Sequence, residues 1–104
     1  MKLHKPLSAR QQAQYERALY SAVLALDSPD EARAFFRDLC TPAELQAMAD
    51  RWAVVELLQQ GMPYREIQRL TGVSVTTVGR VARCLLQGSG YAQVADRLRN
   101  GEAK

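Results

Sequence analysis

Residues 62–86 read MPYREIQRLTGVSVTTVGRVARCLL, a pattern that predicts two short helices joined by a tight turn. Pro63 suits the first position of a helix, where its missing N–H is not needed, and Ile67 and Leu70 then mark one apolar face. Gly72 follows where the chain must reverse, because a left-handed backbone costs little only for glycine. The pattern is that of a helix-turn-helix.

The second helix of this motif combines an apolar stripe with a polar outer face. Ser74 is a good N-cap for it. The stripe consists of Val75, Val78, Val81 and Leu85. The outer face carries Thr76, Thr77, Arg80 and Arg83. In helix-turn-helix proteins that bind DNA the second helix lies in the major groove, so residues 63–86 are the candidate DNA-binding element.

Charge is distributed unevenly along the 104 residues, whose net charge is +3. Residues 1–61 carry seven Lys/Arg and eight Asp/Glu, a net charge of −1. Residues 62–104 carry seven Lys/Arg and three Asp/Glu, a net charge of +4. The basic part contains the helix-turn-helix, and a basic face is the electrostatic footprint of a nucleic-acid binder. The alternative is a buried helical hairpin whose arginines are ordinary surface residues.

Composition argues against membrane, metal and enzyme classes. Hydrophobic residues make up 47% and charged residues 24%, as in one globular domain. No apolar run approaches ~20 residues and no signal peptide is recognisable, so we expect a cytoplasmic protein with no membrane partner. Cys40 and Cys84 lack metal-ligand spacing, His4 is the only histidine, and no phosphate-binding glycine motif occurs. We therefore expect no cofactor, no metal and no enzymatic activity.

The remaining residues predict four more helices, three before the motif and one after it. The first runs from a Ser8 cap to about residue 26, and Ser28 and Thr41 each open a capping box with proline next and glutamate three residues later. The last helix carries Tyr91, Val94, Ala95 and Leu98. The fold class is therefore all-α with six helices. We expect an arm over 1–7, one helical domain over 8–99 and a tail over 100–104.

The first and third helices are each apolar on two sides. In the first helix one stripe is widened well beyond a single face; its residues are Tyr15, Leu19, Tyr20, Ala22, Val23, Leu24 and Leu26. In the third, Trp52 is predicted as a core anchor, and the following residues AVVELL are apolar nearly all round. A small monomer buries little surface, so we expect an obligate homodimer with interleaved long helices.

Two cues together make the chain resemble the Trp-repressor family. They are LCTPAELQAM with Arg51 before the helix-turn-helix, and YREIQRLTGVSVTTVGR within it. The resemblance covers roughly residues 10–99, and RVARCLLQGSGYAQVADRL is similar to a Trp-repressor-like group. It implies an intertwined homodimer that binds operator DNA. TGVSVTTVGRV also resembles Lac-repressor-type regulators, but those have the motif at the N-terminus and usually alanine where this chain has Gln68.

The resemblance also implies which side chains contact the operator. They are Arg65, Gln68, Val75, Thr76, Thr77 and Gly79. By their chemistry, Arg65, Arg69 and Arg83 would grip phosphates, which positions a protein without reading sequence. Base edges would be reached by Gln68, Thr76, Thr77 and Arg80.

The family's tryptophan pocket is matched only in part. Thr41, Arg51 and Arg80 match it, but the repressor has glycine where this chain has Val81 and serine where it has Cys84. Valine adds bulk against the ligand's ring, and a thiol donates a hydrogen bond far more weakly than a hydroxyl. Both departures argue against tryptophan as corepressor. The alternatives are an ion pair for Arg51 and a phosphate contact for Arg80.

The sequence thus predicts a homodimeric transcriptional regulator, a repressor, that binds double-stranded operator DNA through its helix-turn-helix. Two alternatives stay open. The chain is either a dimeric interaction protein that docks on another regulator through the same surface, or a small-molecule-gated sensor with a pocket between the third and fifth helices.

Overall fold

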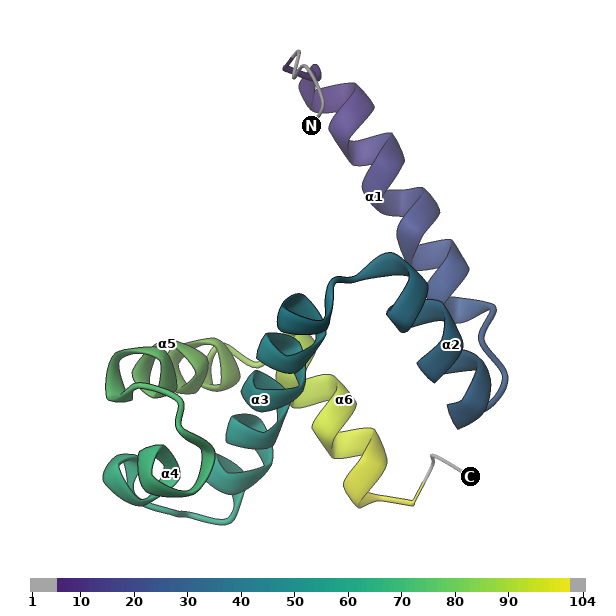
Figure 1. Cartoon of the computed structure of the whole chain (residues 1–104). Helices are drawn as coiled ribbons and strands as arrows, with labels where there is room; N and C mark the ends of the chain where they lie inside the picture. Colours follow the sequence, from purple (N-terminus) through teal and green to yellow (C-terminus); the bar gives the residue numbers. More distant parts are fainter. Residues whose placement is uncertain (1–5, 102–104) are drawn as a thin grey trace. The chain divides into compact units, whose positions relative to one another are not determined.

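The computed structural model describes residues 6–101, which form six α-helices and no strand (Figure 1). The helices are α1 Ala9–Leu24, α2 Pro29–Leu39, α3 Pro42–Gln59, α4 Tyr64–Thr71, α5 Val75–Leu86 and α6 Gly90–Arg99. This confirms the predicted all-α class and the predicted order of helices. Most of the predicted N-terminal arm and of the C-terminal tail lies outside the described residues. None of the six helices is long and apolar enough to cross a membrane.

The helices fall into two compact units, which divide the predicted domain 8–99 between Cys40 and Thr41. Unit 1 contains α1 and α2. Unit 2 contains α3 to α6 and therefore the whole helix-turn-helix.

Unit 1 has helices without a core. No residue of α1 or α2 is buried, and Leu24 is 84% exposed, Tyr15 64% and Tyr20 56%. The rings of Phe35 and Phe36 pack edge to face with centroids 5.3 Å apart. The apolar stripes that the sequence predicts are therefore present, but they remain largely open to solvent.

The starts of α2 and α3 follow the predicted capping chemistry, with one correction in α2. The Thr41 Oγ1 accepts a hydrogen bond from the Glu44 N–H at 3.1 Å, and the Glu44 carboxylate accepts one from the Thr41 N–H at 2.8 Å. Ser28 likewise accepts from the Glu31 N–H, but the Glu31 carboxylate accepts from the Asp27 N–H, not from that of Ser28. Ser28 is fully extended, with φ −152° and ψ 161°, which presents the preceding N–H to the helix instead.

Unit 2 is built around one apolar cluster. Its buried members are Val54, Val55, Ile67, Val78, Val81 and Ala95. Trp52 packs against this cluster, donates its indole N–H to Glu56 at 3.2 Å and lies 6.3 Å from the Tyr91 ring between centroids. Trp52 therefore packs against the core, as predicted, although it is only partly buried. Helix α3 packs against α4, α5 and α6, so the helix-turn-helix rests on α3 (Figure 1).

The buried faces of the helix-turn-helix are narrower than the sequence predicts. Ile67 and Val78 are 0% exposed, but Leu70 is 52% exposed and Val75 38%. Leu70 lies roughly 60° around the helix from Ile67, since each residue advances about 100°, and α4 buries only the narrow side centred on Ile67. Pro63 is also displaced by one position: it is the extended N-cap, with ψ 149°, and the helix begins at Tyr64.

Candidate nucleic-acid interface

The turn between α4 and α5 has a fixed geometry. Gly72 adopts φ +79°, the left-handed conformation expected there, and its N–H donates to the Gln68 carbonyl at 2.8 Å. The Thr71 hydroxyl donates to the Ile67 carbonyl at 2.8 Å and accepts from the Val73 N–H at 3.0 Å. One threonine therefore links the end of α4 to Val73 in the turn, which orders the chain as it leaves α4.

Ser74 begins α5 as predicted and also orients Thr77. Its Oγ accepts from the Thr77 N–H at 3.2 Å and donates to the Thr77 Oγ1 at 3.1 Å. Thr77 is half-buried, whereas the neighbouring Thr76 is exposed. Of the two threonines predicted to contact bases, Thr76 is the more exposed residue, and the Thr77 hydroxyl already accepts a hydrogen bond from Ser74.

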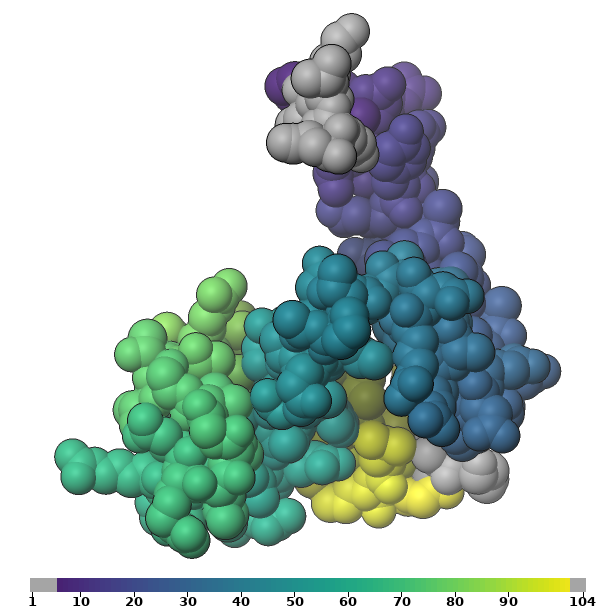
Figure 2. All heavy atoms as spheres, in the orientation of Figure 1, coloured from purple at the N-terminus to yellow at the C-terminus, as the bar shows by residue number. Residues whose placement is uncertain are grey.

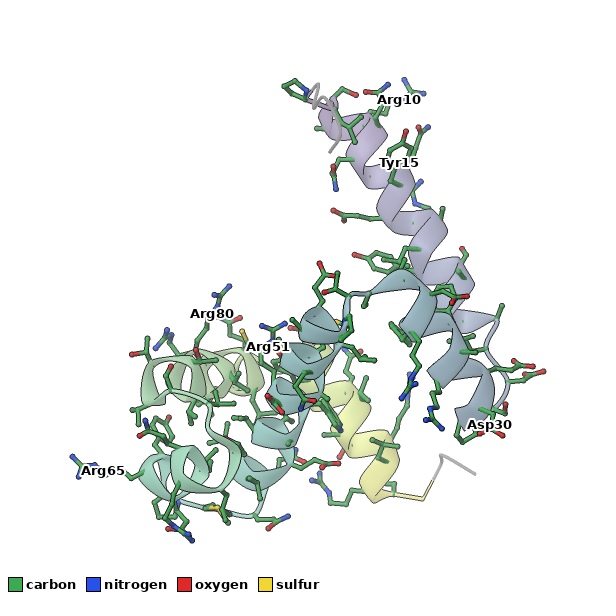
Figure 3. All side chains as sticks on the ribbon, in the orientation of Figure 1. Arg10, Tyr15, Asp30, Arg51, Arg65 and Arg80 are labelled. Atoms are coloured by element: carbon green, nitrogen blue, oxygen red, sulfur yellow. The ribbon has the colours of Figure 1, made fainter. Side chains whose placement is uncertain are left out.

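The predicted DNA-contacting residues lie on two adjoining helices and are mostly exposed. The exposed ones are Arg65, Gln68, Arg69, Val75, Thr76, Arg80 and Arg83. Helices α4 and α5 form one continuous surface (Figure 2), and Arg65 and Arg80 extend away from it (Figure 3). Two predicted residues, Thr77 and Gly79, are only half-exposed.

Gly79 lies where α4 and α5 approach each other. A Cβ atom added there would lie 3.9 Å from Arg83 Nη1 and 3.9 Å from Tyr64 Cε2, both ordinary contacts. Arg83 therefore reaches back along α5 toward α4. Tyr64, 42% exposed, belongs to this surface and was missed by sequence reasoning, because only the packing of the two helices brings it beside Gly79.

Arg69 is paired with Glu66 along α4. The Arg69 Nε donates to Glu66 Oε1 at 3.1 Å, and Nη2 donates to Oε2. This hydrogen bonding from Arg69 lowers the pKa of the Glu66 carboxyl below its usual value. Arg69, which is predicted to bind a phosphate, is therefore already hydrogen-bonded to a carboxylate. An acid three residues before a base is a spacing that predicts such a pair.

A cavity of ≈ 340 Å³ lies beside this surface. It is lined by Arg51 from α3, by Thr77, Arg80, Val81 and Cys84 from α5, and by Tyr91 at the start of α6. Two of the three predicted pocket residues, Arg51 and Arg80, are thus brought together (Figure 3). Thr41, the third, caps α3 through its hydroxyl and is not among the lining residues. Two guanidiniums with no lining carboxylate would attract an anion.

A larger cavity of ≈ 460 Å³ lies between α3 and α6, away from the predicted DNA contacts. Trp52, Ala95 and Leu98 form its apolar lining, with polar residues such as Glu56 and Arg99 beside them. None of the predicted site residues lines it.

Comparisons with known proteins agree with this geometry. The family model of the Trp repressor protein matches residues 14–99. The protein YerC of Bacillus subtilis (strain 168) is 38% identical over 87 residues, which cover 83% of this chain and 84% of YerC.

Two solved structures have the same fold. A TrpR-like protein from Eubacterium eligens ATCC 27750 has a TM-score of 0.76 and 38% identity, over 82% of this chain and 89% of that one. A proposed Trp repressor from Staphylococcus aureus has a TM-score of 0.77 and 31% identity, over 89% of this chain and 96% of that one.

Proposed function

This chain belongs to the Trp repressor family, and from that premise we propose that it is a transcriptional repressor that binds operator DNA as a homodimer in the cytoplasm. The family is one of DNA-binding regulators, and this supports DNA binding over enzymatic activity as the function of this chain.

One observation supports this proposal most strongly: the inner side of the helix-turn-helix is committed to a core, and its outer side is polar and basic. Ile67, Val78 and Val81 are at most 2% exposed, so α4 and α5 are anchored on α3. The outer side presents four arginines and one acid, Glu66. A rigid helix with exposed donors is what readout in a major groove requires.

We assign two kinds of contact to this surface. Arg65 and Arg83 grip phosphates, which fixes the protein on the duplex without reading sequence. Gln68, Thr76 and Arg80 reach base edges, since glutamine suits adenine, arginine suits guanine, and threonine bonds a base or touches a thymine methyl.

The homodimer is proposed from surface that one chain leaves uncovered. No residue of α1 or α2 is buried, and Leu98 of α6 is still 45% exposed beside the partly buried Trp52 in the α3/α6 cavity. Exposed apolar surface of this extent marks an interaction site. A second copy, related by a two-fold axis, would cover these surfaces and present a second recognition helix to the next major groove.

The division of contacts predicts different effects for two substitutions. Arg83→Ala should weaken binding to every duplex and flatten the salt dependence by about 0.9 in log–log slope, one phosphate's share. Thr76→Ala should leave non-specific binding nearly unchanged and cost roughly 1–3 kcal/mol of discrimination at one base pair per half-site. Fluorescence anisotropy on an operator selected from random DNA, and on a random duplex, measures both between 50 and 250 mM KCl.

The same titration separates DNA binding from the interaction-protein alternative. Equal losses for both variants on every sequence would contradict the division of contacts. Wild-type protein that binds no duplex, even at low salt, would contradict the proposed function and favour docking on another protein.

A second candidate function, gating by a small anionic effector, is favoured by the cavity between α3 and α5. Arg51 and Arg80 supply two cationic forks to it, and Thr77 and Arg80 belong to α5, so an occupant would act on the recognition helix itself. A ligand of this native pocket should raise the melting temperature. Inorganic phosphate and short carboxylates are the first probes, and Arg51→Gln should abolish any shift that arises in this cavity.

Free L-tryptophan at millimolar concentration should change neither the melting temperature nor the DNA affinity. Val81 and Cys84 line the cavity where the family's repressor has glycine and serine, so the ring has less room and a weaker hydrogen-bond donor beside it. A thermal melt and an anisotropy titration, each with and without tryptophan, test this. A clear gain in DNA affinity with tryptophan would overturn it.

A further inference from the structure

The helix-turn-helix contains one acidic side chain, and that side chain is bound to an arginine of the proposed DNA surface. Residues 62–86 carry four arginines and Glu66. Glu66 and Arg69 are joined by two hydrogen bonds in the fork-to-carboxylate arrangement, and their side chains are 40% and 67% exposed. Such bidentate pairs are the geometrically specific form of an ion pair.

Helical spacing places Arg69 between a partner and a like charge. At about 100° per residue, Arg69 lies roughly 40° from Arg65 around α4, and Glu66 lies roughly 60° away on the other side. Arg65 and Arg69 are four residues apart and repel each other. The pairing therefore draws the Arg69 guanidinium away from Arg65, which extends outward from α4 (Figure 3).

We propose that Glu66 is a positioning residue that lowers sequence-independent DNA affinity, because it holds Arg69 in an ion pair and so withholds one cationic contact from the phosphate backbone. This inference rests on the proposed function. It adds that the Glu66–Arg69 ion pair limits the affinity of the helix-turn-helix for DNA of any sequence.

The Glu66 carboxylate and a DNA phosphate compete for the Arg69 guanidinium. A phosphate that recruits Arg69 must either displace the Glu66 carboxylate or accept its negative charge nearby, and both lower the gain from the contact. The Glu66 carboxylate is charged at neutral pH, since the hydrogen bonds from Arg69 hold its pKa below the usual value. An exposed ion pair is weak, so its competition with phosphate should lower the DNA affinity by at most about fivefold.

The test is a double-mutant cycle in the 104-residue chain. Wild type, Glu66→Gln, Arg69→Gln and the double variant are titrated against a random duplex and the selected operator from 50 to 250 mM KCl. Glu66→Gln should raise the affinity for both duplexes by the same factor of about two to five. It should also steepen the slope of log affinity against log salt by up to about 0.9, the contribution of one phosphate contact. In the Arg69→Gln background the Glu66→Gln gain should disappear.

Asp96→Asn is the matched control. Asp96 pairs with Arg99 on α6 at 2.8 Å with the same three-residue spacing, and its removal changes the net charge by the same amount. It should leave DNA affinity unchanged, and a gain equal to that of Glu66→Gln would reduce the effect to net charge and overturn the inference. Circular dichroism melts establish that every variant is folded, and analytical ultracentrifugation establishes that Asp96→Asn keeps the wild-type mass, because its partner Arg99 lines the α3/α6 cavity.

Two further outcomes would overturn the inference while leaving the proposed function intact. One is wild-type binding with no gain for Glu66→Gln. The other is a gain that persists in the Arg69→Gln background, which would mean that Glu66 only repels DNA directly. Failure of the wild type to bind either duplex would instead overturn the proposed function, and the inference with it.

Discussion

Leu19→Glu should convert a dimer of twice the 11.6 kDa chain mass into a monomer. Leu19 lies in the apolar stripe of α1 and is still 37% exposed within one chain. If a second copy covers this stripe, the substitution removes about 1.5–3 kcal/mol of apolar burial per chain and buries an unpaired carboxylate. Two-fold symmetry doubles the cost, so dimerisation should weaken by more than about 100-fold. Analytical ultracentrifugation at micromolar concentration measures this directly.

The same variant should also lose operator affinity, because two linked recognition helices bind more tightly than one by a factor of about 10²–10⁴. Gln14→Glu is the matched control: it adds the same charge to α1 but lies on the opposite, polar side of the helix, so both mass and affinity should stay unchanged. A folded wild-type monomer whose melting temperature is independent of concentration would contradict the proposed dimer.

Ile67→Ala should cost about 2–5 kcal/mol of unfolding free energy. Ile67 is the one fully buried residue of α4, and it joins that helix to the core formed by α3 and α5. A cavity at this point should loosen α4 relative to α5 and so weaken operator binding beyond the loss of stability. Urea unfolding monitored by the fluorescence of Trp52 measures the free energy, and anisotropy at low temperature measures the binding.

Leu70→Ala provides the comparison within the same helix. Leu70 is 52% exposed, so truncation of the same kind of side chain removes little burial and should cost well under about 1 kcal/mol. If the two variants unfolded at the same urea concentration, α4 would not be anchored through Ile67, and the account of a rigid helix-turn-helix would be wrong.

Much of the fold follows from local chemistry that a sequence displays. Ser8, Thr41 and Ser74 cap their helices as predicted, because a cap depends on residues only three positions apart. Gly72 adopts the left-handed turn for the same reason. The surface of α4 and α5 follows from helical periodicity once these ends are fixed.

Tertiary packing determines what the sequence could not predict. Leu70 and Val75 match a helical apolar pattern, yet they are exposed, because the width of the buried side depends on how closely α3 and α5 approach. Tyr64 lies on the proposed DNA surface and Tyr91 lines the cavity beside it, both through contacts between helices that leave no local sequence pattern. The Glu66–Arg69 pair, in contrast, follows a recognisable spacing of acid and base three residues apart, so local sequence is enough to predict it.

Hydroxyl-radical footprinting on an operator selected from random DNA is the most direct test of the central claim, that two helix-turn-helix elements of a symmetric dimer read DNA. We expect two protected patches on one face of the duplex, related by a two-fold axis, with centres about one helical turn, ~34 Å, apart. The protection should fade as salt rises. A single protected patch, or patches unrelated by two-fold symmetry, would contradict DNA binding by a symmetric dimer.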